Sequence, residues 1–387
     1  MSTSFETTSR HLLISILEEL VKNGNKITVL KKKFDCEKDD LPPEISDMGI
    51  EVISIPCVSP KKSNFIARYI NDIKYINKCK KLLKTEFDSV FIQSSNVAGL
   101  VMKAVCKKYP NAIKTFNVQD AFPQNAGFSG VLSKNSFPYK VLLKKQKFAY
   151  LQSDHIITIS EDIKRLLVED CGVEPSKIEV VYNWSYIDSV YDESSFDRDE
   201  LSKIYKEECF NVVYAGNIGV MQNVDIILES ANQLKDEKDI WFYIIGNGVY
   251  QNKLKAKAEE YGINNISFLP MLPAKLAPSI YGLADLNIIP LKQDVFKTAV
   301  PSKTATCLAC GKPIVFAIGK SSEFGKRVSD ATGCFLIDSD DANALSEIIL
   351  RVKNKGVIVN STEFYSEHMN KTMNSRKYAE IITKGHE

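Results

Sequence analysis

Two glycine-containing turns in the second half of the chain could hold a phosphate group. The first is Tyr214-Ala215-Gly216-Asn217-Ile218-Gly219, which follows an apolar run and precedes a helical pattern. Glycines there let the backbone approach a ligand closely, and the start of the next helix offers free N–H groups. The second turn is Gly246-Asn247-Gly248, which follows the run WFYII. Either turn could instead be purely structural, because glycine turns between strand and helix are common.

A lysine stands at the start of another candidate element. The segment Val300-Pro301-Ser302-Lys303 leads into an apolar stretch that ends at Gly311. Proline before the stretch and glycine after it are typical of a short helix, and Ser302 could cap it. A cation in the first turn is unfavourable to the helix dipole. A bound anion would explain Lys303, and a solvated surface lysine is the alternative.

Polar residues also follow an apolar run in the first half, within Phe116–Pro123 (FNVQDAFP). The end of a buried strand is where an α/β domain faces its ligand. Asp120 could accept a proton from a hydroxyl group at that place, with Gln119 beside it. Asp120 could equally cap a loop.

Cys307 and Cys310 have a spacing that occurs in metal sites. A zinc site needs two more ligands of suitable spacing, and the chain offers scattered cysteines, nine in all, and four histidines. We therefore interpret the pair as small apolar residues of a buried helix and predict neither a metal site nor a cofactor. The odd number of cysteines favours a reducing compartment with free thiols.

The elements that must position these residues follow an α/β pattern. Short β-branched runs alternate with amphipathic stretches, which predicts parallel sheets with helical crossovers. Strands are expected at 26–30, 51–55, 89–93, 113–118, 155–159, 178–182, 211–215, 241–245, 266–269, 286–290, 314–317 and 334–337. Helices are expected near 5–22, 63–84, 97–108, 137–151 and 161–170. The predicted fold is two doubly wound domains, with ligands at the carboxyl ends of the strands, in the cleft between them.

The domain boundaries follow from composition. We expect a first domain at 1–185, a charged linker at 186–208 with a short helix near 198–207, and a second domain at 209–360. A helical segment at 361–387 is expected to pack back on the first domain.

The chain opens on a helical pattern rather than on a strand. A doubly wound domain starts with a strand that is usually central in its sheet. We therefore expect this strand to be missing from the sequence, unpaired backbone groups to remain at its place, and the true start of the protein to lie upstream.

Basic residues are concentrated at 61–147, which holds 17 Lys/Arg against 4 Asp/Glu although the net charge of the chain is +2. This block predicts an anionic partner. The segments 61–84 and 140–147 are typical of helices lying on an anionic membrane surface, and a core-facing helix with a basic outer side is the alternative. The apolar face of the first segment would be Phe65, Ile66, Tyr69, Ile70, Ile73 and Ile76. Nucleic acid is not expected, because aromatic residues are not interleaved as stacking platforms.

The composition, with 44% hydrophobic and 25% charged residues, excludes a disordered, fibrous or coiled-coil chain. No run of about 18 apolar residues predicts a transmembrane helix. The N-terminus lacks the layout of a signal peptide. We expect a cytoplasmic protein, bound peripherally at the inner face of the cell membrane.

Taken in order, these segments resemble the retaining GT-B glycosyltransferases of glycosyltransferase family 4, above all the WbuB-like branch that builds polysaccharides. The similarity is carried by EELVKNGNKITVL, NVQDAFPQ, SDHIITISEDIKRLL with VVYNW, VVYAGNIG, IIGNG, FLPMLP with YGLADLNIIPL, and VPSKTATCLACGKPIV. It spans nearly the whole chain. It implies a C-terminal domain that binds a nucleotide-sugar donor, expected to be UDP-linked, and an N-terminal domain that presents a lipid-linked or surface-polysaccharide acceptor.

The chain departs from the family at its charged positions. The family's two glutamates, with seven residues between them, fall at Thr298 and Thr306, so Thr306 would hold the ribose through its hydroxyl group. The arginine and lysine after the first strand of the C-terminal domain fall at Asn217 and Gln222. Lys303 in the PSK motif is then the cation expected to stabilise the leaving diphosphate.

The resemblance therefore implies a site with two sides. Lys303 and Asp120 are the catalytic candidates, and Gln119 joins Asp120 on the acceptor side. The donor phosphate is the alternative acceptor of the hydroxyl proton. The donor-binding candidates are Gly216, Asn217, Ile218, Gly219, Gln222, Gly246, Asn247, Gly248, Pro301, Ser302 and Thr306.

Two other functions fit the same architecture. A UDP-sugar 2-epimerase would need acid and base carboxylates that the sequence does not point to. A non-catalytic donor-binding or scaffold subunit would fit the loss of the glutamate pair.

Overall fold

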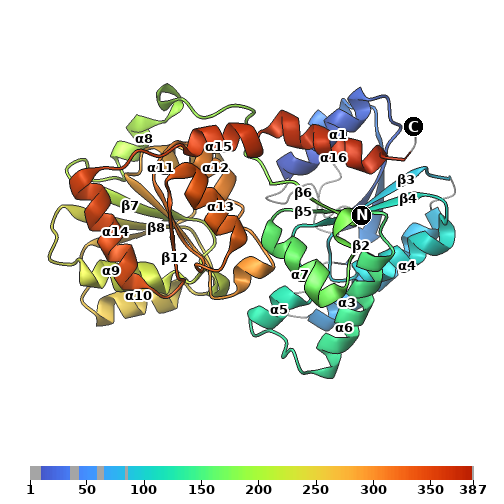
Figure 1. Cartoon of the computed structure of the whole chain (residues 1–387), viewed down its shortest axis with the longest axis horizontal. Coiled ribbons are helices and arrows are strands. Elements are labelled where there is room, and N and C mark those ends of the chain that lie inside the picture. Colours follow the sequence, from blue (N-terminus) through green and yellow to red (C-terminus); the bar gives the residue numbers. More distant parts are fainter. Residues whose placement is uncertain (1–9, 35–42, 59–64, 83–85, 386–387) are drawn as a thin grey trace. The chain divides into compact units, whose positions relative to one another are not determined.

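The chain forms two compact units in the computed structural model, which describes residues 10–34, 43–58, 65–82 and 86–385 (Figure 1). The first unit is Met1–Tyr182 with Lys371–Glu387, and the second is Asn183–Asn370. The predicted linker at 186–208 therefore belongs to the second unit, where it contains the short helix α8 (Arg198–Ser202). The C-terminal segment divides at Lys371 rather than at 361, and only its last part joins the first unit.

The second unit is built on one six-stranded parallel sheet in the order β12-β11-β10-β7-β8-β9. Its strands are β7 (Phe210–Ala215), β8 (Ile240–Ile245), β9 (Ile266–Leu269), β10 (Leu286–Pro290), β11 (Ile314–Ala317) and β12 (Phe335–Ile337). Continuous apolar runs such as Asn211–Ala215 form central strands because helices cover both faces of the sheet.

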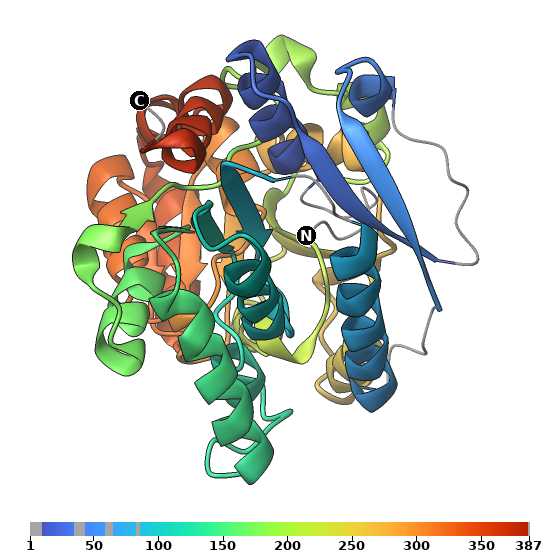
Figure 2. The same cartoon turned by 90° about the vertical axis from the view of Figure 1, so that its right-hand side faces the viewer.

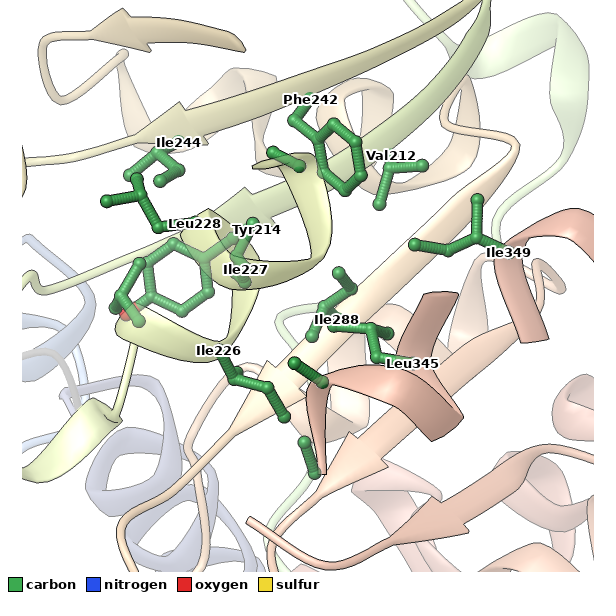
Figure 3. Packing of buried hydrophobic residues seen from close by; sticks show 14 of the residues in the cluster. Val212, Tyr214, Ile226, Ile227, Leu228, Phe242, Ile244, Ile288, Leu345 and Ile349 are labelled. Atoms are coloured by element: carbon green, nitrogen blue, oxygen red, sulfur yellow. The ribbon is translucent and has the colours of Figure 1, made fainter. Parts of the chain in front are cut away.

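Two groups of helices cover this sheet. Helices α9 (Asp225–Gln233), α10 (Gln251–Glu260) and α14 (Ala342–Lys355) pack with the strands into one apolar core. Figure 3 shows this core, in which Leu345 and Ile349 of α14 lie near Val212 and Ile288 of the sheet. The second group consists of α11 (Ala277–Gly282), α12 (Thr304–Ala309), α13 (Glu323–Thr332) and α15 (Ser361–His368), and α11 contacts β7.

The first unit contains two parallel sheets, a pair β1-β2 and a four-stranded sheet β3-β4-β5-β6. Its strands are β1 (Thr28–Phe34), β2 (Glu51–Cys57), β3 (Ser89–Gln93), β4 (Ile113–Val118), β5 (His155–Thr158) and β6 (Ile178–Val180). Its helices are α1 (Arg10–Lys22), α2 (Pro43–Ser46), α3 (Phe65–Leu82), α4 (Ala98–Lys108), α5 (Gln124–Phe128), α6 (Phe137–Leu151), α7 (Glu161–Cys171) and α16 (Lys371–Thr383). Helix α16 contacts α1 and the strands β3, β4 and β5.

In the first unit, the pair β1-β2 is separate from the four-stranded sheet (Figure 2). The second unit has one continuous six-stranded sheet instead. In the second unit β7 lies between β8 and β10, and α9 follows it and leads to β8. In the first unit α1 leads to β1 in the same way, but among the described residues β1 pairs only with β2 and β3 only with β4. The position of β7 has no counterpart in the described part of the first unit, so one edge of β1 and one edge of β3 carry unpaired backbone groups.

Hydrogen exchange should reveal these open edges. Alternate amides of β1 and β3 should exchange at least about tenfold faster than those of β4, which has a neighbour on both sides. Mass spectrometry of peptides covering the three strands measures this, and β7 is the control in the second unit. Equal protection of β3 and β4 would show that both edges of β3 are paired in solution.

The predicted helices and strands lie within a few residues of the observed ones. The strands 89–93, 113–118, 266–269, 286–290 and 314–317 and the helix 137–151 have the observed bounds, because each is a local apolar pattern with clear breakers. Only the part of the first predicted helix from Arg10 onward lies within the described residues. None of the described helices combines the length and the apolar character needed to cross a membrane.

Candidate functional site

The two predicted glycine turns lie side by side at the carboxyl ends of β7 and β8. Gly216 N donates to Ile245 O at 2.8 Å, and Ile218 N donates to Asn247 O at 2.9 Å. Gly216 and Gly246 have φ values of 145° and 148°, which favour glycine. A Cβ on Gly246 would lie 1.8 Å from Gly216 O. The Gly246–Gly248 turn is therefore packed against the backbone of the Gly216–Gly219 turn, which is a structural reason for its glycines.

Neutral side chains hold the Gly216–Gly219 turn in place. Gln222 Oε1 accepts hydrogen bonds from Gly219 N at 3.1 Å and from Asn217 Nδ2 at 3.2 Å. The Tyr214 hydroxyl donates to Asn217 O at 2.5 Å. Asn217 and Gln222, which stand where the family has cations, thus fix the shape of the turn.

The amine of Lys303 lies against this turn. Its Nζ is 3.7 Å from the centroid of the Tyr214 ring, and a Cβ on Gly216 would be 2.8 Å from Nζ. Nζ is buried and has no hydrogen-bond partner among the described residues, although the rest of the residue is partly exposed. Burial lowers the pKa of Lys303 to about 7. A buried polar atom without a partner needs an explanation, and a bound anion supplies one.

Pro301 and Ser302 lie directly before Lys303 at the start of α12. Lys303 directly precedes α12, which has only six residues, so the helix dipole adds little to the site. Pro301 is half-buried and accepts a hydrogen bond from Thr304 N at 3.0 Å. Ser302 is exposed and makes no side-chain cap for α12, contrary to the capping prediction.

The two threonines at the family's glutamate positions are buried. Thr306 is 6% exposed, and its hydroxyl is 3.0 Å from Ser185 Oγ. Thr298 is fully buried and its hydroxyl donates to Val295 O at 3.0 Å. Both hydroxyl groups are therefore engaged within the chain.

In the first unit, a polar network occupies the carboxyl ends of β3 and β4. Asn117 Nδ2 donates to Gln93 Oε1 at 2.9 Å, and Gln119 Nε2 donates to the hydroxyl oxygen of Tyr378 at 3.2 Å. The Tyr378 hydroxyl donates to Asn117 Oδ1 at 3.1 Å. Asp120 is exposed directly beyond this network. Gln119 and Asp120 therefore lie together at this edge, as predicted.

Asn117 and Tyr378 are members of this network that the sequence prediction missed. Asn117 was visible as a polar residue between Phe116 and Val118 in a predicted strand, and a buried amide needs partners. Tyr378 comes from α16, nearly at the other end of the chain. Nothing in the local pattern of α16 relates it to β4.

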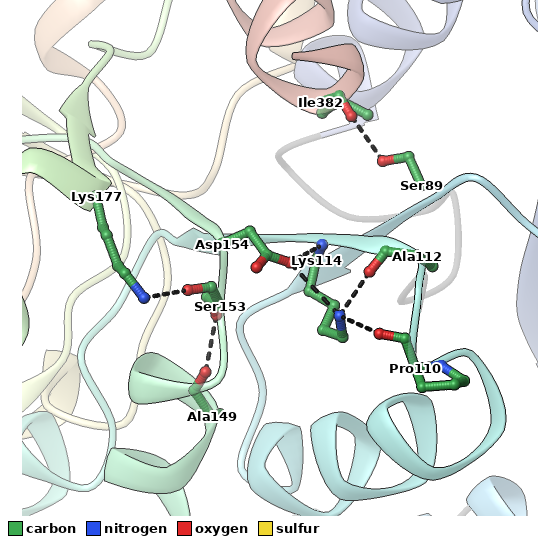
Figure 4. Close-up of polar contacts among 9 residues, drawn as sticks. All are labelled: Ser89, Pro110, Ala112, Lys114, Ala149, Ser153, Asp154, Lys177 and Ile382. Carbon is green, nitrogen blue, oxygen red and sulfur yellow. Dashed lines mark hydrogen bonds and ion pairs between the residues drawn. The ribbon is translucent and has the colours of Figure 1, made fainter. Parts of the chain in front are cut away.

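A second polar cluster lies at the amino ends of the same strands (Figure 4). Lys114 Nζ donates to Ala112 O at 2.6 Å, and Lys114 N donates to Asp154 Oδ2 at 2.8 Å. The Ser89 hydroxyl donates to Ile382 O at 2.6 Å, which attaches the end of α16 to β3. These contacts hold strands and helices of the first unit together. Ligands of such sheets bind at the opposite edge, at the carboxyl ends of the strands.

A cavity of about 630 Å³ lies elsewhere in the first unit, between α3 and α4. Apolar residues line it together with Lys103, Lys107 and Lys108, and none of the predicted site residues does. Cys307 and Cys310, on and directly after α12, are both buried. The described residues contain no group of three or more side chains suited to hold a metal ion.

Comparisons with known proteins match both units. Residues 11–185 match the model of Glycosyltransferase Family 4, and residues 197–377 match that of Glycosyl transferases group 1. The probable glycosyltransferase WbjE of Pseudomonas aeruginosa is 26% identical over 324 residues, which are 82% of this chain and 78% of WbjE. The colanic acid biosynthesis glycosyl transferase WcaI of Escherichia coli K12 is 27% identical over 175 residues, which are 45% of this chain and 42% of WcaI.

Solved structures agree in fold at low identity. WaaG, a glycosyltransferase involved in lipopolysaccharide biosynthesis, superimposes with a TM-score of 0.71 at 14% identity, covering 100% of this chain and 99% of WaaG. Anabaena HepE, solved with UDP and glucose, has a TM-score of 0.71 at 13% identity, covering 99% of this chain and 98% of HepE.

WbjE and WcaI are named as glycosyltransferases, and both family models describe glycosyltransferases, which favours transfer over the epimerase and scaffold alternatives. The order of the parallel strands and the two family models lead to one classification. The chain is a glycosyltransferase of the GT-B fold, whose first half matches the Glycosyltransferase Family 4 model and whose second half matches the Glycosyl transferases group 1 model.

Proposed function

We propose that this enzyme transfers a sugar from a UDP-linked donor, with retention of configuration, to a lipid-linked or surface-polysaccharide acceptor. The observation that carries the donor side is the buried amine of Lys303, which lies against the Gly216 turn and has no hydrogen-bond partner in the described part of the chain. HepE, which has the same fold, was solved with UDP and with UDP-glucose. WcaI is named for colanic acid biosynthesis and WaaG for lipopolysaccharide biosynthesis, which supports a saccharide acceptor of the cell surface.

The charges of the reaction give the residues their roles. The bond between the anomeric carbon and the phosphate oxygen breaks, and negative charge develops on the departing diphosphate. A preorganised cation and backbone N–H groups aimed at this charge lower the barrier. Lys303 is the proposed cation for this role, since the amides of Gly216, Ile218 and Gly219 already donate to acceptors within the chain. The acceptor oxygen forms the new bond to the anomeric carbon, and its proton goes to Asp120 or to the donor phosphate.

A donor screen by thermal shift tests this proposal. UDP-sugars should raise the melting temperature, and GDP- and CMP-sugars at equal concentration should not. A ligand at 100 times its Kd adds about 2.7 kcal/mol of stability, which is readily measured. A response to GDP- or CMP-sugars alone would overturn the UDP assignment. If no nucleotide sugar raises the melting temperature of protein that unfolds cooperatively, the proposed donor site itself would be overturned.

Membrane attachment through the basic residues of the first unit is part of the same proposal. Helix α6 exposes Lys140 and Lys144 beside Phe137, which is 80% exposed. The predicted face of α3 is less suitable, because Ile76 is only 6% exposed and packs into the protein. The side chains of Phe65, Ile66 and Tyr69 and residues 61–64 and 83–84 lie outside the described part of the chain. Helix α6 is therefore the favoured contact with anionic lipid at the inner face of the membrane.

Binding to vesicles measures this contribution. The double variant Lys140→Ala and Lys144→Ala should bind anionic vesicles roughly 30-fold more weakly, since each lysine near such a surface contributes about 1 kcal/mol. The matched control is Lys253→Ala with Lys255→Ala, two exposed lysines of α10. Equal binding by the two double variants would exclude α6 as the membrane contact.

A further inference from the structure

The surroundings of the Lys303 amine do not suit a charged group. Nζ is buried, makes no hydrogen bond to a described atom, and lies over the face of the Tyr214 ring. An ammonium carries three N–H donors and a full charge, and both are costly to bury without partners. The face of an aromatic ring offsets only part of that cost. An uncharged amine therefore fits this place better than an ammonium.

Within the described residues, the titratable groups around the amine provide no counter-charge. They are Tyr214 on β7 and Cys307 on α12, with Tyr281 of α11 next to both. Burial raises the pKa of each of these three groups well above its ordinary value, so all three are neutral near pH 7. Burial also lowers the pKa of Lys303 to about 7, in agreement with the geometry.

We propose that Lys303 is uncharged in the free enzyme above neutral pH and takes up one proton from solvent when the donor diphosphate binds beside Gly216. This inference rests on the donor site proposed above. The diphosphate supplies the negative charge that the buried surroundings lack, and an opposite charge at this distance favours the ammonium. The cation thus forms only when the leaving group that it stabilises is present.

Donor affinity should then depend on pH in a defined direction. Below about pH 7 the free enzyme already carries the proton, and affinity should be nearly constant. Above it, binding must bring a proton in, so the affinity for the donor should fall by up to tenfold per pH unit. Exposed lysines keep their charge over this range and would give no such dependence.

Calorimetry measures the proton directly. A UDP-sugar is the suitable probe, because its diphosphate is esterified at both ends and does not titrate near pH 7. Titrations at pH 8 in HEPES and in Tris, which differ in ionisation enthalpy, should show uptake of close to one proton per nucleotide. The same comparison at pH 6 should show almost none.

The outcomes separate this inference from the proposed function. Binding without proton uptake at pH 8 would overturn the inference and leave the donor site intact, whereas absence of binding would overturn the donor site. Lys303→Met should bind more weakly and take up no proton, and uptake that persists in this variant would place the proton elsewhere. Tyr214→Phe keeps the ring under the amine and should retain the uptake. If Lys303→Met does not bind, the difference in uptake between pH 6 and pH 8 in the wild type decides the question.

Discussion

Lys303→Met is expected to lower kcat/KM for sugar transfer by about 10²- to 10³-fold, the usual effect of removing one preorganised donor from a developing anion. Methionine keeps most of the length and volume of the lysine side chain beside Tyr214 and Gly216. The loss should appear in steady-state kinetics with saturating acceptor, as a lower kcat together with weaker donor binding.

The same variant should not unfold the protein. The unfolded chain binds a proton that the buried amine, with its lowered pKa, does not hold above about pH 7. Stability from this lysine therefore rises with pH toward its ordinary pKa, and at neutral pH the lysine costs stability. Lys303→Met should keep or raise the melting temperature, and the exposed Lys320→Met in the same unit should leave turnover within about twofold. Full activity of Lys303→Met would remove Lys303 from the mechanism.

The second large effect is expected for Gly246→Ala, which should destabilise the second unit by about 2–4 kcal/mol. The new Cβ would lie 1.8 Å from Gly216 O, so the two interlocked turns would have to separate. The φ of 148° at this residue adds strain. Denaturant unfolding measures the loss, and donor binding should fall with it because the Gly216 turn moves.

Gly262→Ala is the matched control for this variant. Gly262 also has a positive φ, 61°, but a Cβ there would have nothing within 4 Å. It should therefore cost only the backbone strain, about 1 kcal/mol. Equal losses in the two variants would mean that the contact between the turns contributes little.

Much of the fold follows from local pattern. Strands such as Leu286–Pro290 and Ile314–Ala317 are mostly apolar runs between breakers, and two covered faces require such runs. The Gly216 turn and the polar pair Gln119 and Asp120 were predicted at strand ends because a parallel sheet brings its carboxyl ends to one edge. The domain boundaries were less predictable, since the composition of residues 186–208 predicted a charged linker, whereas these residues belong to the second unit.

Other features, such as the partners of buried hydroxyl groups, became visible only in the folded structure. The assignment of Thr306 to the ribose followed the family's spacing, but the hydroxyl group of Thr306 is engaged by Ser185, which lies far away in sequence. The predicted capping role of Ser302 was wrong, because α12 starts without a side-chain cap. The spacing of residues in the sequence does not reveal which hydroxyl groups form hydrogen bonds with residues far away in the chain.

The sequence by itself therefore determined the fold class, most of the strands, and the residue types at the sheet edges, because these depend on periodicity and on backbone preferences within a few residues. Only the tertiary structure decided how these residues act. It brought Tyr378 of the last helix onto Asn117 and placed the Lys303 amine beside Tyr214 and Gly216, with no hydrogen-bond partner among the described residues. Such burial arises only when distant segments pack together, and burial is what lowers the pKa of Lys303, on which its proposed proton uptake depends.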